Sequence, residues 1–503
     1  ARTGLKALSA ACFGGQGQLS MAMRSRAPQR GEDGAAPDGA ASGRGSSARR
    51  AMTPMARTLE VGGFPQDMNM TDPIINVLLF FDRLPPAGAW AREFEAHLYP
   101  AFRFSSRMDN GYWVQAQEFD AAYHFPEVAV ADEAAIDAHV QGSFFEGLDR
   151  TRPPWRVVLL SAPAPSRSAA WIRIHHSIGD GLGLLFAMSP MFGCEGGDLL
   201  GKVPLPAALL PPGARPQAEA AAAAAPRPRK ACGDGVRKFV RGLGVALLAK
   251  PDSELSINPP LSERTPYLKF NGRRALARFP PVEMSLVQQI RRRHGCSVND
   301  VLMAALTGAL RRFGAEVNDD ERLKGDAAGP LECKTLMLIG LPRPVDPSDM
   351  AGSVSNRHLY ASLALPVHES DRARRVKGVM RATDALKSRP YIAGLSSFID
   401  LVNAVAPNFL KRKAIGETFS KHSLIVTNVP APTAPTTFPR DGDNAQVIKE
   451  VQMVFPNIIP QVSIITYGGF VHANIVADPA LFPQPQELGR LWVEEFAALL
   501  GGP

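Results

Sequence analysis

A predicted strand that runs directly into a glycine-rich turn and an apolar helix is the feature that most restricts the fold of this chain. The strand is predicted at Trp171–His175 and the helix at Leu184–Phe192, and the turn between them contains Gly179, Gly181 and Gly183. Glycine lacks a Cβ atom, so three glycines let this backbone bend sharply and approach another group closely. The turn is therefore the first candidate for a functional site.

Two adjacent histidines stand at the end of the predicted strand. Side chains alternate across a strand, so His175 shares a face with Trp171, whereas His176 shares the opposite face with Ile172 and Ile174. Histidines that point apart do not readily bind one metal ion, and a zinc site needs further ligands. No spaced Cys, Asp or Glu partner stands out. We therefore predict no metal site here.

Helices and strands are intermixed along the rest of the chain. Apolar runs and alternating patterns predict strands at residues 74–81, 156–160, 335–340, 359–365, 424–428, 462–467 and 470–476. Apolar stripes of helical spacing predict helices at residues 90–98, 298–313 and 488–499. Because both types occur in both halves, the predicted fold class is α/β or α+β.

Two low-complexity segments divide the chain. Residues 1–57 are rich in Ala, Gly, Ser and Arg, and residues 201–231 are rich in Pro and Ala. Such compositions do not bury enough apolar surface to offset their ordering entropy. We therefore predict a disordered tail over 1–57, a first lobe over 58–200, a linker over 201–255 and a second lobe over 256–503.

The net charge of +8 is concentrated in the low-complexity segments. Residues 1–57 carry +6 and residues 201–251 carry +7, so the remainder is mildly acidic. That remainder has no basic stripe with interleaved aromatic residues, which would be typical of a nucleic-acid-binding protein. We therefore expect no nucleic-acid partner.

The linker contains a predicted basic amphipathic helix. Arg237, Lys238 and Arg241 lie opposite an apolar face that runs from Val236 to Leu247. Such a helix either lies on an anionic membrane surface or packs against its own domain. No run of 18 apolar residues occurs, so a membrane-spanning helix is not expected.

The five cysteines are odd in number and form no C-x-x-C pattern, which favours a reducing compartment.

The segment His175-His176-Ser177-Ile178-Gly179-Asp180-Gly181 resembles the His-His-x-x-x-Asp-Gly signature of the CoA-dependent acyltransferase superfamily. Without that resemblance, the same residues could form a tight turn in which Asp180 caps the helix. The rest of the chain selects a branch of the superfamily. The Asp-Phe-Gly-Trp-Gly motif of plant alcohol acyltransferases is absent.

Further motifs, in the expected order, resemble the wax ester synthase/diacylglycerol acyltransferase family. They are Arg152-Pro153-Pro154-Trp155, where Pro154 replaces the family's Leu, Ser297-Val298-Asn299-Asp300, Ser355-Asn356-Arg357, Thr427-Asn428-Val429-Pro430-Ala431-Pro432 and Ala477-Asp478-Pro479. Each motif also has a structural interpretation. Ser297 with Asp300 matches a helix cap, and the Asn428 segment matches turn chemistry after a strand.

The resemblance implies a two-lobed, chloramphenicol-acetyltransferase-like fold with an active-site tunnel between the lobes. His176 would be the general base, His175 a supporting neighbour, and Gly181 would keep the turn open beside the tunnel. Asp180 would shape the loop through an arginine. Asn299 and Asp300 are the predicted substrate-binding residues, with Asn299 as a donor to the reaction's oxyanion.

The implied reaction transfers an acyl group from acyl-CoA, as co-substrate and with no bound cofactor, to a long-chain alcohol or diacylglycerol. Arg343, which follows a predicted strand, either contacts the CoA phosphates or is a solvated loop charge. A different alcohol or amine acceptor, or a non-catalytic lipid-binding scaffold, are the alternatives. Lipid substrates imply a membrane-associated protein at the endoplasmic reticulum or a lipid-droplet surface. The Arg-rich, acid-poor tail also suits a transit peptide, for example to a plastid.

Overall fold

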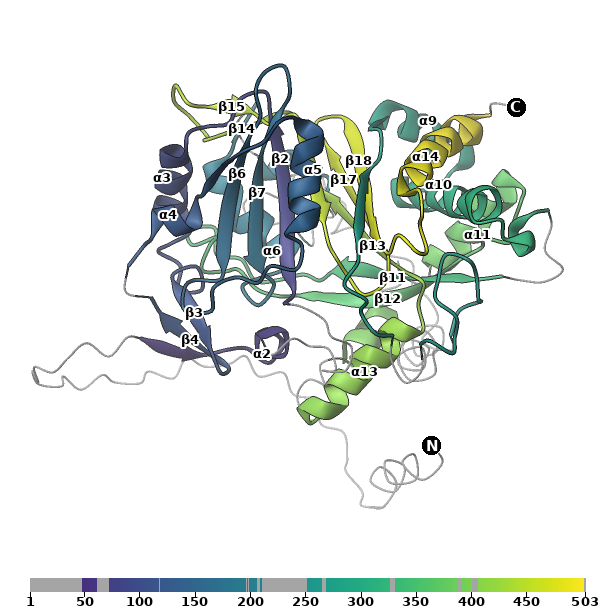
Figure 1. Cartoon of the computed structure of the whole chain (residues 1–503), viewed down its shortest axis with the longest axis horizontal. Helices are drawn as coiled ribbons and strands as arrows, with labels where there is room; N and C mark the ends of the chain where they lie inside the picture. The colour runs from purple at the N-terminus through teal and green to yellow at the C-terminus, as the bar shows by residue number, and fades with distance from the viewer. Residues whose placement is uncertain are drawn as a thin grey trace, which may run out of the picture. The chain divides into compact units, whose positions relative to one another are not determined.

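The computed structural model describes residues 48–60, 72–205, 209, 251–264, 268–325, 331–384, 386, 391–397, 399 and 406–501, except 117, 196 and 198. Two mixed sheets with flanking helices form the core of this part of the chain (Figure 1). The predicted class of mixed α and β structure is confirmed.

The first sheet is built around two buried strands, β2 (Ile74–Phe81) and β7 (Ser168–His175). Its order is β16–β2–β7–β6–β5, and the other three strands are Glu450–Val454 (β16), Trp155–Ser161 (β6) and Glu127–Ala129 (β5). All of β7 and all but one residue of β2 are buried. Burial on both faces explains why these segments are almost continuously apolar in sequence.

The second sheet has the order β10–β18–β17–β13–β11–β12, with β9 also paired to β18. Its strands are Val282–Glu283 (β10), Phe470–Ala477 (β18), Gln461–Tyr467 (β17), Leu424–Pro430 (β13), Cys333–Gly340 (β11), His358–Leu365 (β12) and Ala275–Arg278 (β9). Strand β13 is parallel to both β11 and β17. Gly468 and Gly469, both at positive φ, form the two-residue turn between β17 and β18, as expected for a tight hairpin.

Helices cover the sheets through apolar faces. The second sheet packs against α9 (Met284–His294), α10 (Val298–Arg312), α11 (Arg372–Asp384) and α14 (Pro485–Leu500). The first sheet packs against α3 (Ala87–His97) and α6 (Gly181–Met188) on one face and against α5 (Glu133–Gly142) on the other. Shorter elements are α2 (Pro54–Glu60), α4 (Ala121–His124), β1 (Arg49–Ala51), β3 (Ser106–Asp109), β4 (Tyr112–Gln115), β8 (Gly193–Cys194), β14 (Thr436–Phe438) and β15 (Gln446–Val447). All predicted strands are present, and so are the helices predicted at residues 90–98, 298–313 and 488–499, with small shifts of their ends.

The helix predicted at residues 184–192 differs from the observed one. Helix α6 ends at Met188, and a 3-10 turn follows at Ser189–Met191. Pro190 lies in that turn and has no N–H, so it cannot donate to the carbonyl of Phe186 as an α-helix would require. Instead, the Ser189 hydroxyl donates to the Phe186 carbonyl at 2.8 Å.

The two halves of the chain exchange strands, so the predicted division at the linker is not the division of the sheets. Strand β16 comes from the second half, yet it pairs with β2 at the edge of the first sheet. Strand β14 likewise pairs with β8. The physical reason is that β2 is apolar along its length and needs a partner on each edge.

The predicted tail also extends too far. Residues 49–51 form strand β1, which pairs with β4, and α2 follows. The guanidinium groups of Arg49 and Arg50 lie over the rings of Tyr112 and Phe102, and these cation–π contacts help to order a segment that has few apolar residues. Residues 1–47 and the predicted basic helix of the linker lie outside the described residues.

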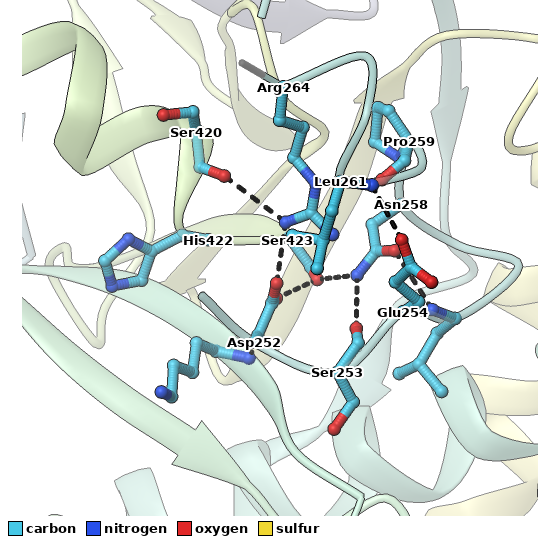
Figure 2. Close-up of polar contacts among 12 residues, drawn as sticks. Asp252, Ser253, Glu254, Asn258, Pro259, Leu261, Arg264, Ser420, His422 and Ser423 are labelled. Atoms are coloured by element: carbon cyan, nitrogen blue, oxygen red, sulfur yellow. Dashed lines mark hydrogen bonds and ion pairs between the residues drawn. The ribbon is translucent and has the colours of Figure 1, made fainter. Parts of the chain in front are cut away.

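Where the described chain resumes after the linker, it is held by a buried ion pair (Figure 2). Arg264 donates to the Asp252 carboxylate at 2.7 Å, and both side chains are almost fully buried. Asp252 also accepts from the Ser423 hydroxyl, and Arg264 donates to the Ser420 carbonyl at 3.3 Å. This network fixes residues 252–264 to the junction of α13 (Asn408–Ser420) and β13.

Candidate active site

The His-His turn lies between the end of β7 and the start of α6. The His175 amide donates to the Pro154 carbonyl, and the His176 amide donates to the Pro73 carbonyl. The guanidinium of Arg103 holds the carbonyl of Ile178 at 2.9 Å. Contacts within the first half of the chain therefore already hold the turn on several sides.

The two histidines lie in different environments, as the alternation predicted. Ile172 and Ile174, which precede His176 on its face of the strand, belong to the core under α6. Trp171, on the face of His175, packs with Ile136 of α5 in a different core. Among the described residues, no group of three or more His, Cys, Asp or Glu side chains is placed to hold a metal ion.

His175 is completely buried and serves the turn. Its Nδ1 accepts from the backbone amide of Ser177 at 3.2 Å and lies 2.8 Å from the Ser177 hydroxyl. Burial lowers the pKa of His175 to about 3, with smaller contributions from Arg150 and His176. His175 is therefore neutral at physiological pH and holds the backbone beside His176.

His176 is half-buried, and Asn356 determines which nitrogen of its neutral ring carries the proton. The Asn356 amide nitrogen donates to the His176 carbonyl at 2.8 Å, so the amide oxygen faces the imidazole, 3.0 Å from Nδ1. An amide oxygen is an acceptor, so Nδ1 must carry the ring proton in the neutral imidazole. The lone pair is consequently on Nε2, which is the state that a general base requires.

The pKa of His176 is lowered to about 4, first by burial and then by the neighbouring His358. The two imidazole rings lie 5.2 Å apart between centroids. Near pH 7 the imidazole is therefore neutral and ready to accept a proton. Asp180 and Asn356 oppose the shift but do not outweigh burial.

Asp180 organises the loop through its hydrogen bonds and ion pairs. Its carboxylate accepts from the Gly183 amide at 2.9 Å, which caps α6, and from the Arg357 amide at 2.6 Å. Arg343 binds both carboxylate oxygens, at 2.6 and 3.1 Å. Burial would raise the pKa of Asp180, but the side chains of His358 and Arg343 hold it well below its usual range. The arginine expected beside this aspartate is therefore Arg343.

Arg343 has neither of the two roles that the sequence left open for it, a contact with the CoA phosphates or a solvated loop charge. Its side chain is 1% exposed, and it also donates to the carbonyls of Ser355 and Arg357. A guanidinium enclosed in this way is neither a solvated loop charge nor a ligand for the CoA phosphates. It joins the end of β11 to the aspartate turn instead.

The glycines of the turn have two different roles. A Cβ atom on Gly179 would lie 2.6 Å from Val354, and one on Gly183 would lie 2.9 Å from the Ser355 carbonyl. These two glycines let the residue 354–357 segment approach the turn closely. Gly181 has open space beside it and lines a cavity.

The cavity has an almost entirely apolar wall, and the empty space of about 900 Å³ at this place includes open solvent. It extends along β2 from Ile75 to Leu79, beside Ile172 and Ile174 of β7. The opposite wall includes the Val429–Pro432 segment, which also contains a predicted motif. A cavity of this kind accommodates a hydrocarbon chain, and His176 follows directly on the face of β7 that lines it.

Asn299 and Asp300 lie at the start of α10 and differ in accessibility. The Asp300 carboxylate forms a capping box with Ser297, accepts from the Thr383 hydroxyl at 2.5 Å and is buried. Contrary to prediction, Asp300 is placed to stabilise the helix start and not to contact substrate. The Asn299 amide oxygen accepts from Asn428 at 3.2 Å, while its amide nitrogen has a contact with the Met337 sulfur at 4.0 Å. The neighbours of Asn299 thus orient this nitrogen, whose contact with the Met337 sulfur is weak.

Trp155 of the Pro-Pro-Trp motif has a packing role. Its ring stacks on His124, with 3.8 Å between centroids, and its indole donates to the Phe104 carbonyl.

Asn356 is a residue of the site that the sequence did not identify as a site residue. Its motif was recognised, but nothing in the spacing of residues 180 positions apart indicates that Asn356 meets His176.

The two sheets, the strand exchange, and the histidine turn beside an apolar cavity define the class of two-lobed CoA-dependent acyltransferases. Among solved structures, a wax ester synthase/diacylglycerol acyltransferase from Marinobacter aquaeolei matches with a TM-score of 0.55 at 16% identity, covering 85% of this chain and 94% of that one. A condensation domain of the calcium-dependent antibiotic synthetase matches with a TM-score of 0.55 at 14% identity, covering 91% and 98%. These likenesses confirm the predicted two-lobed fold.

Sequence comparison identifies the family. The model of the wax ester synthase/diacylglycerol acyltransferase catalytic domain matches residues 92–302, and that of the WS/DGAT C-terminal domain matches residues 354–500. The O-acyltransferase WSD of Acinetobacter baylyi is 20% identical over 422 residues, which are 77% of this chain and 83% of that protein. The chain belongs to the wax ester synthase/diacylglycerol acyltransferase family and is an acyl-CoA-dependent O-acyltransferase.

Proposed function

We propose that the enzyme transfers a fatty acyl group from acyl-CoA to a long-chain alcohol, to diacylglycerol, or to both, with His176 as the general base. The observation that supports this proposal best is the Asn356 contact, which leaves the Nε2 of His176 free of a proton at the end of a strand that lines an apolar cavity. The relatives' names, which refer to wax esters and diacylglycerol, agree with it.

The reaction needs a base because an alcohol hydroxyl has a pKa far above neutrality. In the proposed step, Nε2 of His176 accepts the hydroxyl proton while the alcohol oxygen bonds to the thioester carbonyl carbon. The tetrahedral species then collapses, its carbon–sulfur bond breaks, and the CoA sulfur leaves with the proton from Nε2. The base is regenerated and no acyl-enzyme forms. Such proton transfer typically contributes about 10²–10⁴ in rate.

Other groups in the site would support this step. The amide nitrogen of Asn299 is our candidate donor to the negative oxygen of the tetrahedral species, because a positioned donor stabilises that charge. His175, Asp180 and Arg343 keep the turn in shape, and Gly181 keeps the cavity open beside it. We propose that the cavity binds the hydrocarbon chain of one substrate.

The test uses purified full-length protein with labelled palmitoyl-CoA and either hexadecanol or diacylglycerol. We expect ester with at least one acceptor and a loss of at least about 100-fold in kcat for His176→Ala. The matched control is His97→Ala, since His97 is an exposed histidine on α3. Unchanged turnover in His176→Ala would exclude the general-base role. No ester from any alcohol or amine acceptor would favour a lipid-binding scaffold.

We also propose that the enzyme works at a membrane or lipid-droplet surface, because long-chain alcohols and diacylglycerol partition into such surfaces. None of the described helices is both long and apolar enough to cross a bilayer. A docking surface on the folded protein, or a basic segment such as that containing Arg237 and Arg241, would bind such a surface.

A further inference from the structure

The most exposed large apolar side chains of the described chain lie side by side at the start of α13. Phe409 is 68% exposed and Leu410 is 45% exposed. Exposed apolar residues that occur singly need no explanation, whereas contiguous exposed apolar side chains are the feature that interaction surfaces share. Neither residue has a role in the cavity or in the histidine turn.

The charges around these residues indicate what they contact. At 100° per residue, Phe409, Leu410, Lys413 and Ala414 share one face of the helix, and all four are exposed. Lys411 and Arg412 also carry positive charge, but both are half-buried and have partners of their own. The acidic residue of this helix, Glu417, lies a turn further on and forms an ion pair with Lys421 at 3.9 Å. The exposed end is therefore apolar and cationic together.

The opposite end of α13 is firmly held. Phe419 and Ser420 are buried, and the Ser420 carbonyl accepts from Arg264 in the buried network around Asp252 (Figure 2). The carboxyl end of α13 is therefore buried and anchored, while its amino end, which carries Phe409, is exposed. A helix anchored in this way can insert two side chains without rearranging the fold.

We propose that the amino-terminal half of α13, from Phe409 to Ala414, docks onto an anionic lipid surface. Phe409 and Leu410 would enter the boundary between headgroups and acyl chains, and Lys413 would bind lipid phosphates. Apolar side chains beside basic ones are the combination that such surfaces retain. A protein partner with an acidic apolar groove would share part of this chemistry, but the proposed lipid acceptors of the enzyme favour a lipid surface. The assignment rests in that respect on the proposed function.

The experiment measures binding without substrates, so it is independent of acyl transfer. Full-length protein is floated with vesicles of phosphatidylcholine containing 30% phosphatidylglycerol, or of phosphatidylcholine alone. We expect Phe409→Ser with Leu410→Ser to lower the partition coefficient on anionic vesicles at least tenfold, and Lys413→Glu to lower it several-fold. Raising the salt concentration should weaken binding further, because it screens the phosphate contacts.

The matched control is Phe470→Ser, which removes another exposed aromatic residue, 41% exposed, at the β17–β18 turn. It should leave vesicle binding unchanged, and thermal unfolding should show that all variants are folded. Equal binding of the Phe409/Leu410 variant and the parent would overturn the proposal. The proposal would also be overturned if neutralising Arg237, Lys238 and Arg241 abolished binding while the α13 variant still bound. A change in sedimentation showing that the surface is a contact between two copies would overturn it as well.

Discussion

Asn356 holds His176 at two points, with its amide oxygen 3.0 Å from Nδ1 of the ring and its amide nitrogen 2.8 Å from the backbone carbonyl. One side chain thereby fixes both the position of the histidine and the location of its proton. The two residues come from different halves of the chain. The proposed base is therefore competent only when the segment at residues 354–357 is docked on the histidine turn.

The first prediction concerns this contact. Asn356→Ala should lower kcat about 10- to 100-fold, because the imidazole can then rotate and adopt the wrong tautomer, while KM for acyl-CoA changes little. Steady-state kinetics on both substrates measures the two effects separately. A purely structural role for Asn356 would instead lower the melting temperature and leave kcat of the remaining folded enzyme near that of the parent.

The second prediction concerns pH. The base must be neutral, and burial lowers the pKa of His176 to about 4. Activity should therefore be retained at pH 6 and fall as the pH drops through about 4, provided that the protein remains folded. Asn356→Asp places a carboxylate beside the ring, which favours the protonated imidazole, so the acidic limb should move to higher pH. An acidic limb near 6.5 in the parent enzyme would contradict the buried environment of His176.

The third prediction concerns chain length. Leu79, at the far part of the cavity, pairs with Ala170, six residues before His176, so about 20 Å separates them along β7. An extended carbon chain advances about 3.6 Å for every three bonds, as an extended backbone does, which allows about 16 bonds. Leu79→Phe should shorten the preferred chain of one substrate by several carbons. Product analysis over series of acyl-CoA and alcohol lengths, with Leu79→Ala as the opposite change, tests this, and unchanged preferences for both series would refute it.

The fourth prediction concerns the buried pair of Asp180 and Arg343. Arg343→Met leaves the carboxylate buried without its cation and should destabilise the protein by about 3–5 kcal/mol. Asp180→Asn combined with Arg343→Met should recover part of this loss, which a double-mutant cycle by chemical denaturation measures. Additive effects would show that the two groups do not interact.

Linkage gives the same pair a pH signature. The folded-state pKa of Asp180 lies below its unfolded value of about 3.9, so the stabilisation is complete above pH 5. It is lost as the pH falls toward the folded-state pKa. Denaturation of the parent between pH 3 and 5 should therefore show a fall in stability that the Asp180→Asn variant lacks in part.

The sequence predicted the local structure well, because strand and helix patterns depend on neighbours along the chain. The buried strand at residues 74–81 and the helix at 298–313 needed no more than their periodicity. The separation of His175 from His176 followed from alternation for the same reason. The fold class and family followed from motifs in order.

Long-range relationships were the ones that sequence reasoning missed. Arg343 is polar and follows a strand, which is equally typical of an exposed charge, and its enclosure by Asp180 depends on how two halves dock. The local sequence pattern of β16 likewise does not indicate that this strand pairs with β2 in the first sheet. Asp300 has the residue type of a ligand-binding group, but its carboxylate is buried and accepts from Ser297 and Thr383.

The place of β16 has a consequence for biosynthesis. During translation, the ribosome releases β2 hundreds of residues before Glu450–Val454 appears, so the edge of β2 that β16 later covers is open for much of synthesis. A nascent chain with such an edge is prone to pairing with the wrong strand. We therefore expect the first sheet to be completed late, only after Glu450–Val454 has been made.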